Sequence, residues 1–254
     1  MVAEPMSSKN IILDRIRAAL ASGAESPEIP RDYRRGPAEV DLDLLVERLV
    51  DYKAVVHRLN PEKSGIEPVI GGGVEGSGPQ AGVADARPLD GVEAEGAAGG
   101  GSGGERAASA GAAAVRAAIA DILGAGTVVV PPGLPLEWLP DGVVGLVDDG
   151  LSAERIAAAD GVVTAAAVAV VETGTIVLDA SPDQGRRIIS LLPDLHICVL
   201  RADQVVASVP EAVARLDPTR PLTWISGPSA TSDIELNRVE GVHGPRNLHV
   251  ILTG

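Results

Sequence analysis

The chain has 254 residues, of which 45% are hydrophobic and only 2% aromatic, with no phenylalanine. Its 21 basic and 35 acidic residues give a formal net charge of -14, which argues against a nucleic-acid groove and against docking to an anionic membrane surface. The single cysteine, Cys198, permits no disulfide within the chain and no cysteine-ligated iron–sulfur cluster. The N-terminus lacks a signal-peptide pattern and no apolar stretch reaches about 18 residues, so we expect a cytoplasmic protein without membrane insertion.

Residues 1–60 are predicted to form a mainly helical N-terminal segment. In "SSKNIILDRIRAALAS", the side chains of Ile12, Ile16 and Leu20 recur at helical spacing. "VDLDLLVERLVDY" is typical of a second amphipathic helix, and "KAVVHRL" of a short strand after it. We expect the apolar helix faces to pack on the main domain or across the interface of a homo-oligomer.

Residues 71–104 have almost no large apolar side chains and are rich in Gly and Ala. Such a stretch cannot offset the entropy cost of its own ordering, so we expect a mobile insertion. "GGGVEGSG" within it resembles a phosphate-binding glycine loop, but no strong strand leads into it and no helix opens directly after it.

Residues 105–254 alternate between helix and strand patterns. Helical "AAAVRAAIADIL" and "SAERIAAA", the latter capped by Ser152, are interspersed with β-branched runs such as "GTVVVPP" and "DLHICVL". This order is typical of an α/β layer structure with a largely parallel sheet. In "AVAVVETGTIVLDA" two strand-like runs flank Glu172–Thr175, which predicts a tight turn between antiparallel strands and therefore a mixed sheet.

Hydroxyl and carboxylate side chains are concentrated after the strand "LTWIS". Ser229 and Thr231 can donate hydrogen bonds to an anionic ligand, or they can cap a helix that opens near Asp233. Glu172 is either an ordinary turn residue or a functional carboxylate, and His196 or His243 could exchange a proton near neutral pH. No two histidines have metal-ligand spacing, so no metal site is predicted. We expect residues 226–235, 172–175 and 240–245 to converge in one cleft at the carboxyl ends of the central strands, with the charge of Arg186 or Arg246 offsetting the carboxylates.

Three motifs resemble the LUD-domain family, in its lactate utilisation protein C (LutC) group. These are "VVETGTIVL", "QGRRIISLLPDLHICVL" and "TWISGPSATSDIELNRVEGVHGPRNLHVIL", which follow one another in the family's order over residues 115–254. The resemblance implies a three-layer α/β fold with a mainly parallel mixed sheet of NagB/RpiA/CoA-transferase-like type, here with an N-terminal helical extension. The sequence departs from the pattern at Ala230, where an arginine is common.

The resemblance implies a role in the oxidation of L-lactate to pyruvate, with iron–sulfur oxidoreductase subunits as partners. We therefore expect an accessory component that binds a small anionic ligand, and the identity of any organic cofactor stays open. The alternatives are a stand-alone enzyme that binds CoA, a nucleotide or a sugar phosphate, and a purely structural scaffold. The expected catalytic residues are Glu172, Asp233 and His243. The expected ligand-binding residues are Thr173, Gly174, Arg186, Gly227, Ser229, Thr231, Glu235 and Gly244.

Overall fold

The computed structural model describes residues 8–21, 39–59, 66–69, 103–229 and 244–254. Two compact units divide the chain, Met1–Arg35 and Gly36–Gly254. In the first unit, helix α1 spans Ser8–Leu20, where helical spacing predicted it. Most of the predicted insertion at residues 71–104 lies outside the described residues, although helix α3 (Gly103–Leu123) already begins at its end.

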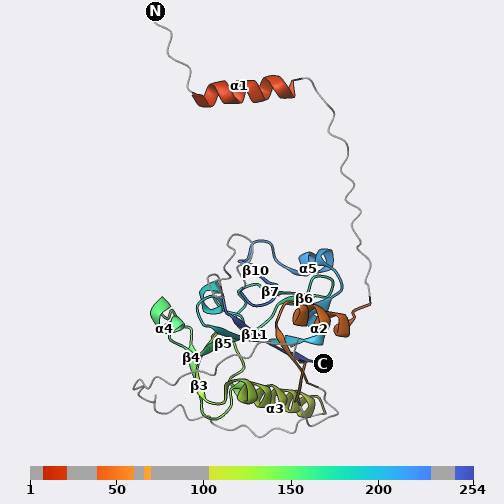
Figure 1. The fold of residues 1–254 in the computed structure, drawn as a ribbon, viewed down its shortest axis with the longest axis vertical. Helices are drawn as coiled ribbons and strands as arrows, with labels where there is room; N and C mark the ends of the chain where they lie inside the picture. Colours follow the sequence, from red (N-terminus) through yellow and green to blue (C-terminus); the bar gives the residue numbers. More distant parts are fainter. Residues whose placement is uncertain (1–7, 22–38, 60–65, 70–102, 230–243) are drawn as a thin grey trace, which may run out of the picture. The chain divides into compact units, whose positions relative to one another are not determined.

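A large sheet with mainly parallel strands forms the centre of the second unit (Figure 1). Its order is β2-β1-β11-β8-β5-β3-β4, and every neighbouring pair is parallel except β1 and β2. The mixed, mainly parallel sheet expected from the sequence is thus confirmed. The strand bounds are β1 Val55–Leu59, β2 Ile66–Val69, β3 Gly126–Val130, β4 Val143–Val147, β5 Gly161–Ala165, β8 Leu195–Arg201 and β11 Asn247–Thr253.

A second, smaller sheet contains the strands β10-β7-β6-β9. The turn expected at 172–175 does join two antiparallel strands, but these belong to this separate sheet rather than to the large one. Every residue of β6 and β7 is buried, because other elements pack on both faces of this sheet. The strand bounds are β6 Val168–Val170, β7 Thr175–Leu178, β9 Val205–Val206 and β10 Thr223–Ile225.

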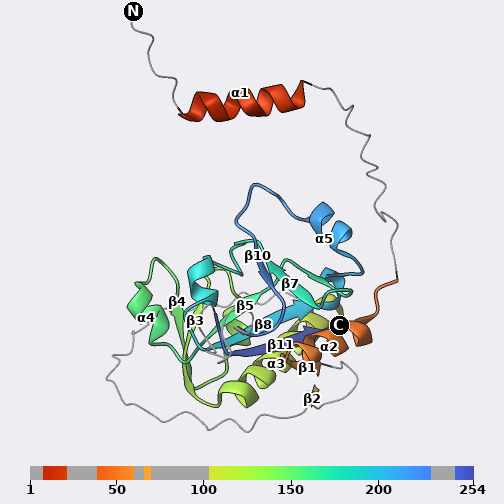
Figure 2. The ribbon, with the colours of Figure 1, turned by 45° about the horizontal axis from the view of Figure 1, so that its top comes forward.

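Helices and the small sheet cover the two faces of the large sheet. One face packs on α3 through a core that includes Ile119, Val163 and Ile251. The other face packs on α2 (Leu42–Asp51) and on the small sheet, through a core that includes Leu45, Ile176 and Cys198. Helix α5 (Val209–Arg215) covers the outer face of the small sheet. Figure 2 shows this order, with α3 on the far side of the large sheet from β7, β10 and α5.

Short helical segments complete the edge near β4. Helix α4 (Ala153–Ala157) begins at Ser152, whose hydroxyl accepts the Arg155 N–H, so the predicted cap is confirmed. Ile156 of α4 and Ile189 form a local core with Val129 and Val162. Three short 3-10 helices span Leu136–Trp138, Arg187–Ser190 and Ala202–Gln204. Among the described residues, no helix is both long and apolar enough to cross a membrane.

Candidate functional site

Hydroxyl side chains meet where β10 ends and β7 begins. The antiparallel register pairs Ile225 with Ile176, which places Ser226 beside Thr175, and their hydroxyl oxygens lie 2.8 Å apart. The Thr175 hydroxyl also lies within donating distance of the Thr173 carbonyl oxygen, at 3.3 Å. The Thr173 Oγ1 is buried and has no hydrogen-bond partner among the described residues. We call Thr173, Thr175 and Ser226 the hydroxyl cluster.

Two glycines let the hydroxyl cluster pack against the end of α2. Gly174 (φ +56°) and Gly227 (φ +83°) have left-handed backbones that other residues rarely adopt. A Cβ at Gly174 would lie 2.7 Å from the Arg48 Cβ, and one at Gly227 would lie 2.5 Å from the Tyr52 carbonyl oxygen. Both glycines are therefore required for close packing on α2, independently of any ligand.

Ser229 and the residues before β11 are also in contact. The Ser229 N–H donates to the Pro245 carbonyl oxygen at 2.7 Å, and a Cβ at Gly244 would lie 3.7 Å from the Ser229 Cβ. Arg246 forms a bidentate ion pair with Asp194, with N···O distances of 2.5 and 2.8 Å. Two contacts therefore join the described parts of the three predicted segments. Ser226 contacts Thr175, and Ser229 contacts Pro245. The remaining predicted residues of these segments, Thr231, Asp233, Glu235 and His243, lie outside the described residues.

The position of these contacts corrects the expected edge of the sheet. Ser226 does follow the carboxyl end of β10, but β10 belongs to the small sheet. Pro245 and Asp194 immediately precede β11 and β8, and Tyr52 lies shortly before β1. The contacts therefore border the amino ends of the central parallel strands, not their carboxyl ends.

Glu172 lies in the exposed turn between β6 and β7. Its Oε1 accepts the Val209 N–H at 3.0 Å, and its own N–H donates to the Ala207 carbonyl oxygen at 3.2 Å. The carboxylate thus satisfies a free N–H group at the start of α5, where the Ser208 side chain forms no cap hydrogen bond. Glu172 is therefore a turn residue whose carboxylate has a specific donor, and a catalytic role for it stays a prediction.

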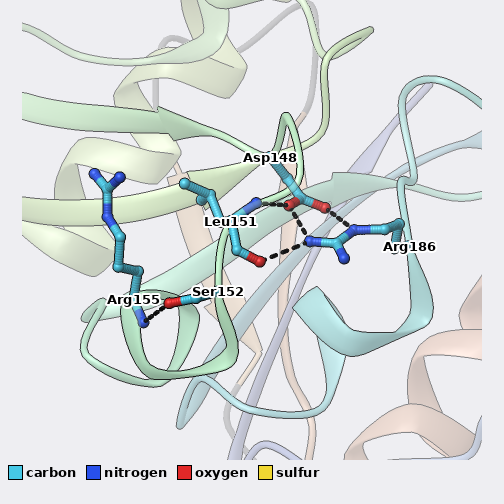
Figure 3. Close-up of polar contacts among 5 residues, drawn as sticks. All are labelled: Asp148, Leu151, Ser152, Arg155 and Arg186. Atoms are coloured by element: carbon cyan, nitrogen blue, oxygen red, sulfur yellow. Dashed lines mark hydrogen bonds and ion pairs between the residues drawn. The ribbon is translucent and has the colours of Figure 1, made fainter.

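Arg186 meets Asp148, the residue that follows the carboxyl end of β4 (Figure 3). Its Nε and Nη2 donate to the two carboxylate oxygens of Asp148 at 2.8 and 2.5 Å, and Nη2 also donates to the Leu151 carbonyl oxygen at 3.1 Å. The Asp148 side chain is 1% exposed, and the hydrogen bonds from Arg186 hold the pKa of this carboxyl below its ordinary value despite burial. The structure therefore does not bring Arg186 to the hydroxyl cluster, because Asp148 follows the carboxyl end of β4.

Comparison with known proteins identifies the family. The sequence model of the LUD domain matches residues 143–253. Over 143 residues the chain is 57% identical to lactate utilization protein C of Deinococcus radiodurans, a match that covers 54% of this chain and 68% of that protein. The chain belongs to the LUD-domain family.

Further relatives agree with this assignment. Lactate utilization protein C of Shouchella clausii is 35% identical over 108 residues, which cover 39% of this chain and less than half, 45%, of that protein. The crystal structure of a DUF162 family protein from Deinococcus radiodurans superposes with a TM-score of 0.56 at 34% identity, covering 84% of this chain and 96% of that one. The family resemblance and the mixed α/β fold are thus confirmed, while the specific NagB/RpiA-like type stays a prediction.

Within the LUD domain, the position of His196 does not suit the proton exchange near neutral pH that its place at a strand end suggested. It is 1% exposed, and its Nε2 lies 2.8 Å from the Thr164 hydroxyl. Burial lowers the pKa of His196 to about 4, so the ring is neutral at pH 7. Cys198, on the same strand, is fully buried, and burial raises the pKa of its thiol to about 12.

A pair of histidines was not foreseen from the sequence. His57 of β1 and His249 of β11 are 192 residues apart, and the parallel pairing of these strands places the His57 Nε2 3.0 Å from the His249 Nδ1. Burial lowers the pKa of His57, and burial together with the charge of His57 lowers that of His249 to about 4. Among the described residues, no group of three or more His, Cys, Asp or Glu side chains is arranged to hold a metal ion.

Proposed function

We propose that this LUD-domain chain is an accessory component of a system that oxidises L-lactate to pyruvate. The observation that carries this proposal is the 57% identity to a protein named lactate utilization protein C. In this proposal the chain acts beside iron–sulfur oxidoreductase subunits and binds a small anionic ligand.

The cysteine content supports a system in which other subunits carry the electrons. Oxidation of lactate to pyruvate releases electrons that need an acceptor, and iron–sulfur clusters are held mainly by several cysteine thiolates. The only cysteine of this sequence, Cys198, is buried between α2, the small sheet and the large sheet, and its thiol is held protonated. Electron transfer through clusters is therefore assigned to the partner subunits.

The hydroxyl cluster is the best-supported place for the anionic ligand. Hydroxyl groups can donate to carboxylate or phosphate oxygens, and the buried Thr173 Oγ1 has no described partner. A buried hydroxyl without a hydrogen bond costs stability, so a ligand oxygen at this point would satisfy it. Ser226 and Thr175 lie beside it, and the Ser229 N–H is held at Pro245.

The test is growth of a strain from which the gene has been deleted. We expect loss of growth on L-lactate as sole carbon source, retained growth on pyruvate, and rescue by the intact gene. Unimpaired growth on L-lactate would contradict the proposal. Rescue by a Thr173→Val variant should be weaker than rescue by a Thr219→Val variant, since the hydrogen bonds of Thr219 in the described part of the chain stay within its own turn, at Asp217.

A second measurement separates the subunit from a stand-alone enzyme. Purified protein is screened by thermal shift against CoA esters, nucleotides and sugar phosphates. A ligand present at about 100 times its dissociation constant adds about 2.7 kcal/mol to stability, which is readily detected. We expect none of these compounds to be turned over by the isolated chain, and turnover of any of them would overturn the accessory role.

A further inference from the structure

An anion at the hydroxyl cluster needs a positive charge beside it. The Glu172 carboxylate lies in the same turn, and the last turn of α2 carries the partial negative charge of a helix C-terminus. Neither favours an anionic ligand, and the hydroxyl groups of Thr173, Thr175 and Ser226 have no net charge with which to offset them.

The two arginines expected to supply this charge are engaged elsewhere. Arg186 is paired with Asp148 at the carboxyl end of β4, and Arg246 forms a bidentate ion pair with Asp194. A guanidinium that is already matched to a carboxylate by two parallel hydrogen bonds has its charge largely neutralised.

Arg48 of α2 lies against the turn that carries the hydroxyl cluster. Its Cβ, carbonyl carbon and carbonyl oxygen would lie 2.7, 3.2 and 3.3 Å from a Cβ at Gly174, the residue between Thr173 and Thr175. The Arg48 side chain is exposed, and it forms no ion pair with any carboxylate in the part of the chain that the structure describes. Its length allows the guanidinium to reach a ligand bound at the neighbouring hydroxyls.

We propose that Arg48 is the cationic ligand-binding residue of the hydroxyl cluster, and that the ligand is a small carboxylate or phosphate. The inference rests on the proposed binding of an anion at this cluster. It adds a residue that lies outside the segment matched by the LUD model, at residues 143–253, and so gives α2 a role in the site. In the simplest other explanation, Arg48 only complements the negative end of α2.

Titration calorimetry on the full chain distinguishes these explanations. L-lactate, pyruvate and inorganic phosphate are titrated separately into the wild type, Arg48→Gln, Arg48→Lys and Arg187→Gln. Arg187 is a matched control, since it is an exposed arginine without a described ion pair and stands beside Arg186. Unfolding of each ligand-free variant is measured in parallel.

We expect the wild type to bind at least one probe and Arg48→Gln to bind it at least about tenfold more weakly, as for loss of one hydrogen bond to a charged group. Arg48→Lys should recover part of the affinity, Arg187→Gln should bind like the wild type, and the melting temperature of ligand-free Arg48→Gln should stay close to that of the wild type. Equal affinity of Arg48→Gln and wild type, or no binding of any probe to the wild type, overturns the proposal. Loss of binding in Arg48→Gln alongside normal growth of the deletion strain on L-lactate would retain the site and reject the lactate function.

Discussion

Burial of His196 is expected to make the fold sensitive to mild acid. The imidazole is 1% exposed and its pKa is lowered from 6.5 to about 4. Between these two values the unfolded chain binds a proton that the folded chain does not, so acid favours unfolding. The contribution of His196 to stability is complete above pH 6.5 and is lost as the pH falls toward 4.

The size of the effect follows from the two pKa values. At pH 5.0 an unfolded imidazole is almost fully protonated and the buried one is almost fully neutral, which costs the folded state about 2 kcal/mol relative to pH 7.5. His249, whose pKa is also lowered to about 4, adds a loss in the same direction.

Urea unfolding at pH 7.5 and 5.0 measures this loss. In His196→Gln, where an amide can still bond the Thr164 hydroxyl, we expect the fall in the free energy of unfolding to be smaller than in the wild type by about 2 kcal/mol. Thr164→Val is the control, since it removes the hydrogen bond at His196 but leaves the buried ring, so its pH dependence should match the wild type. An equal fall in wild type and His196→Gln would refute the reasoning.

Two further predictions concern packing and reactivity. Gly227→Ala and Gly150→Ala both place a side chain on a left-handed backbone, at φ +83° and +77°, but only the first would meet a neighbour, the Tyr52 carbonyl oxygen at 2.5 Å. In urea unfolding each should lose about 1 kcal/mol from backbone strain, and Gly227→Ala a further 1–3 kcal/mol or so; equal losses would contradict this packing. The Cys198 thiol, buried and with its pKa raised to about 12, should resist iodoacetamide until the protein is denatured, so rapid alkylation under native conditions would contradict its burial.

Local patterns predicted the elements that depend on neighbouring residues. The helical spacing of Leu42, Leu45 and Leu49 places these side chains against one core, and β8 lies within the apolar run "LHICVLR". The turn at Glu172–Thr175 needs a left-handed residue, and Gly174 supplies it at φ +56°. Such features are readable because periodicity and backbone freedom are properties of a short stretch of chain.

The candidate site was predictable only in part. The sequence indicated hydroxyl side chains at Thr173 and Thr175 and after Ile225. The structure places the hydroxyl oxygens of Thr175 and Ser226 2.8 Å apart. The separate small sheet could not be foreseen, because strand alternation does not specify which strands will pair. The sequence also does not show which distant residues will pair. Arg186 was therefore expected in the cleft, and its ion pair with Asp148, 38 residues away, was not predicted.

The sequence by itself determined the composition of the core, the positions of most helices and strands, and membership of the LUD-domain family through motifs that are local. Only the tertiary structure decided that Arg48 lies against Gly174 and that His57 bonds His249. It also placed Arg186 at the carboxyl end of β4 and Ser229 beside the amino end of β11. These contacts join residues far apart in the chain, and they exist because the burial of the apolar faces selects one packing of the elements over the others.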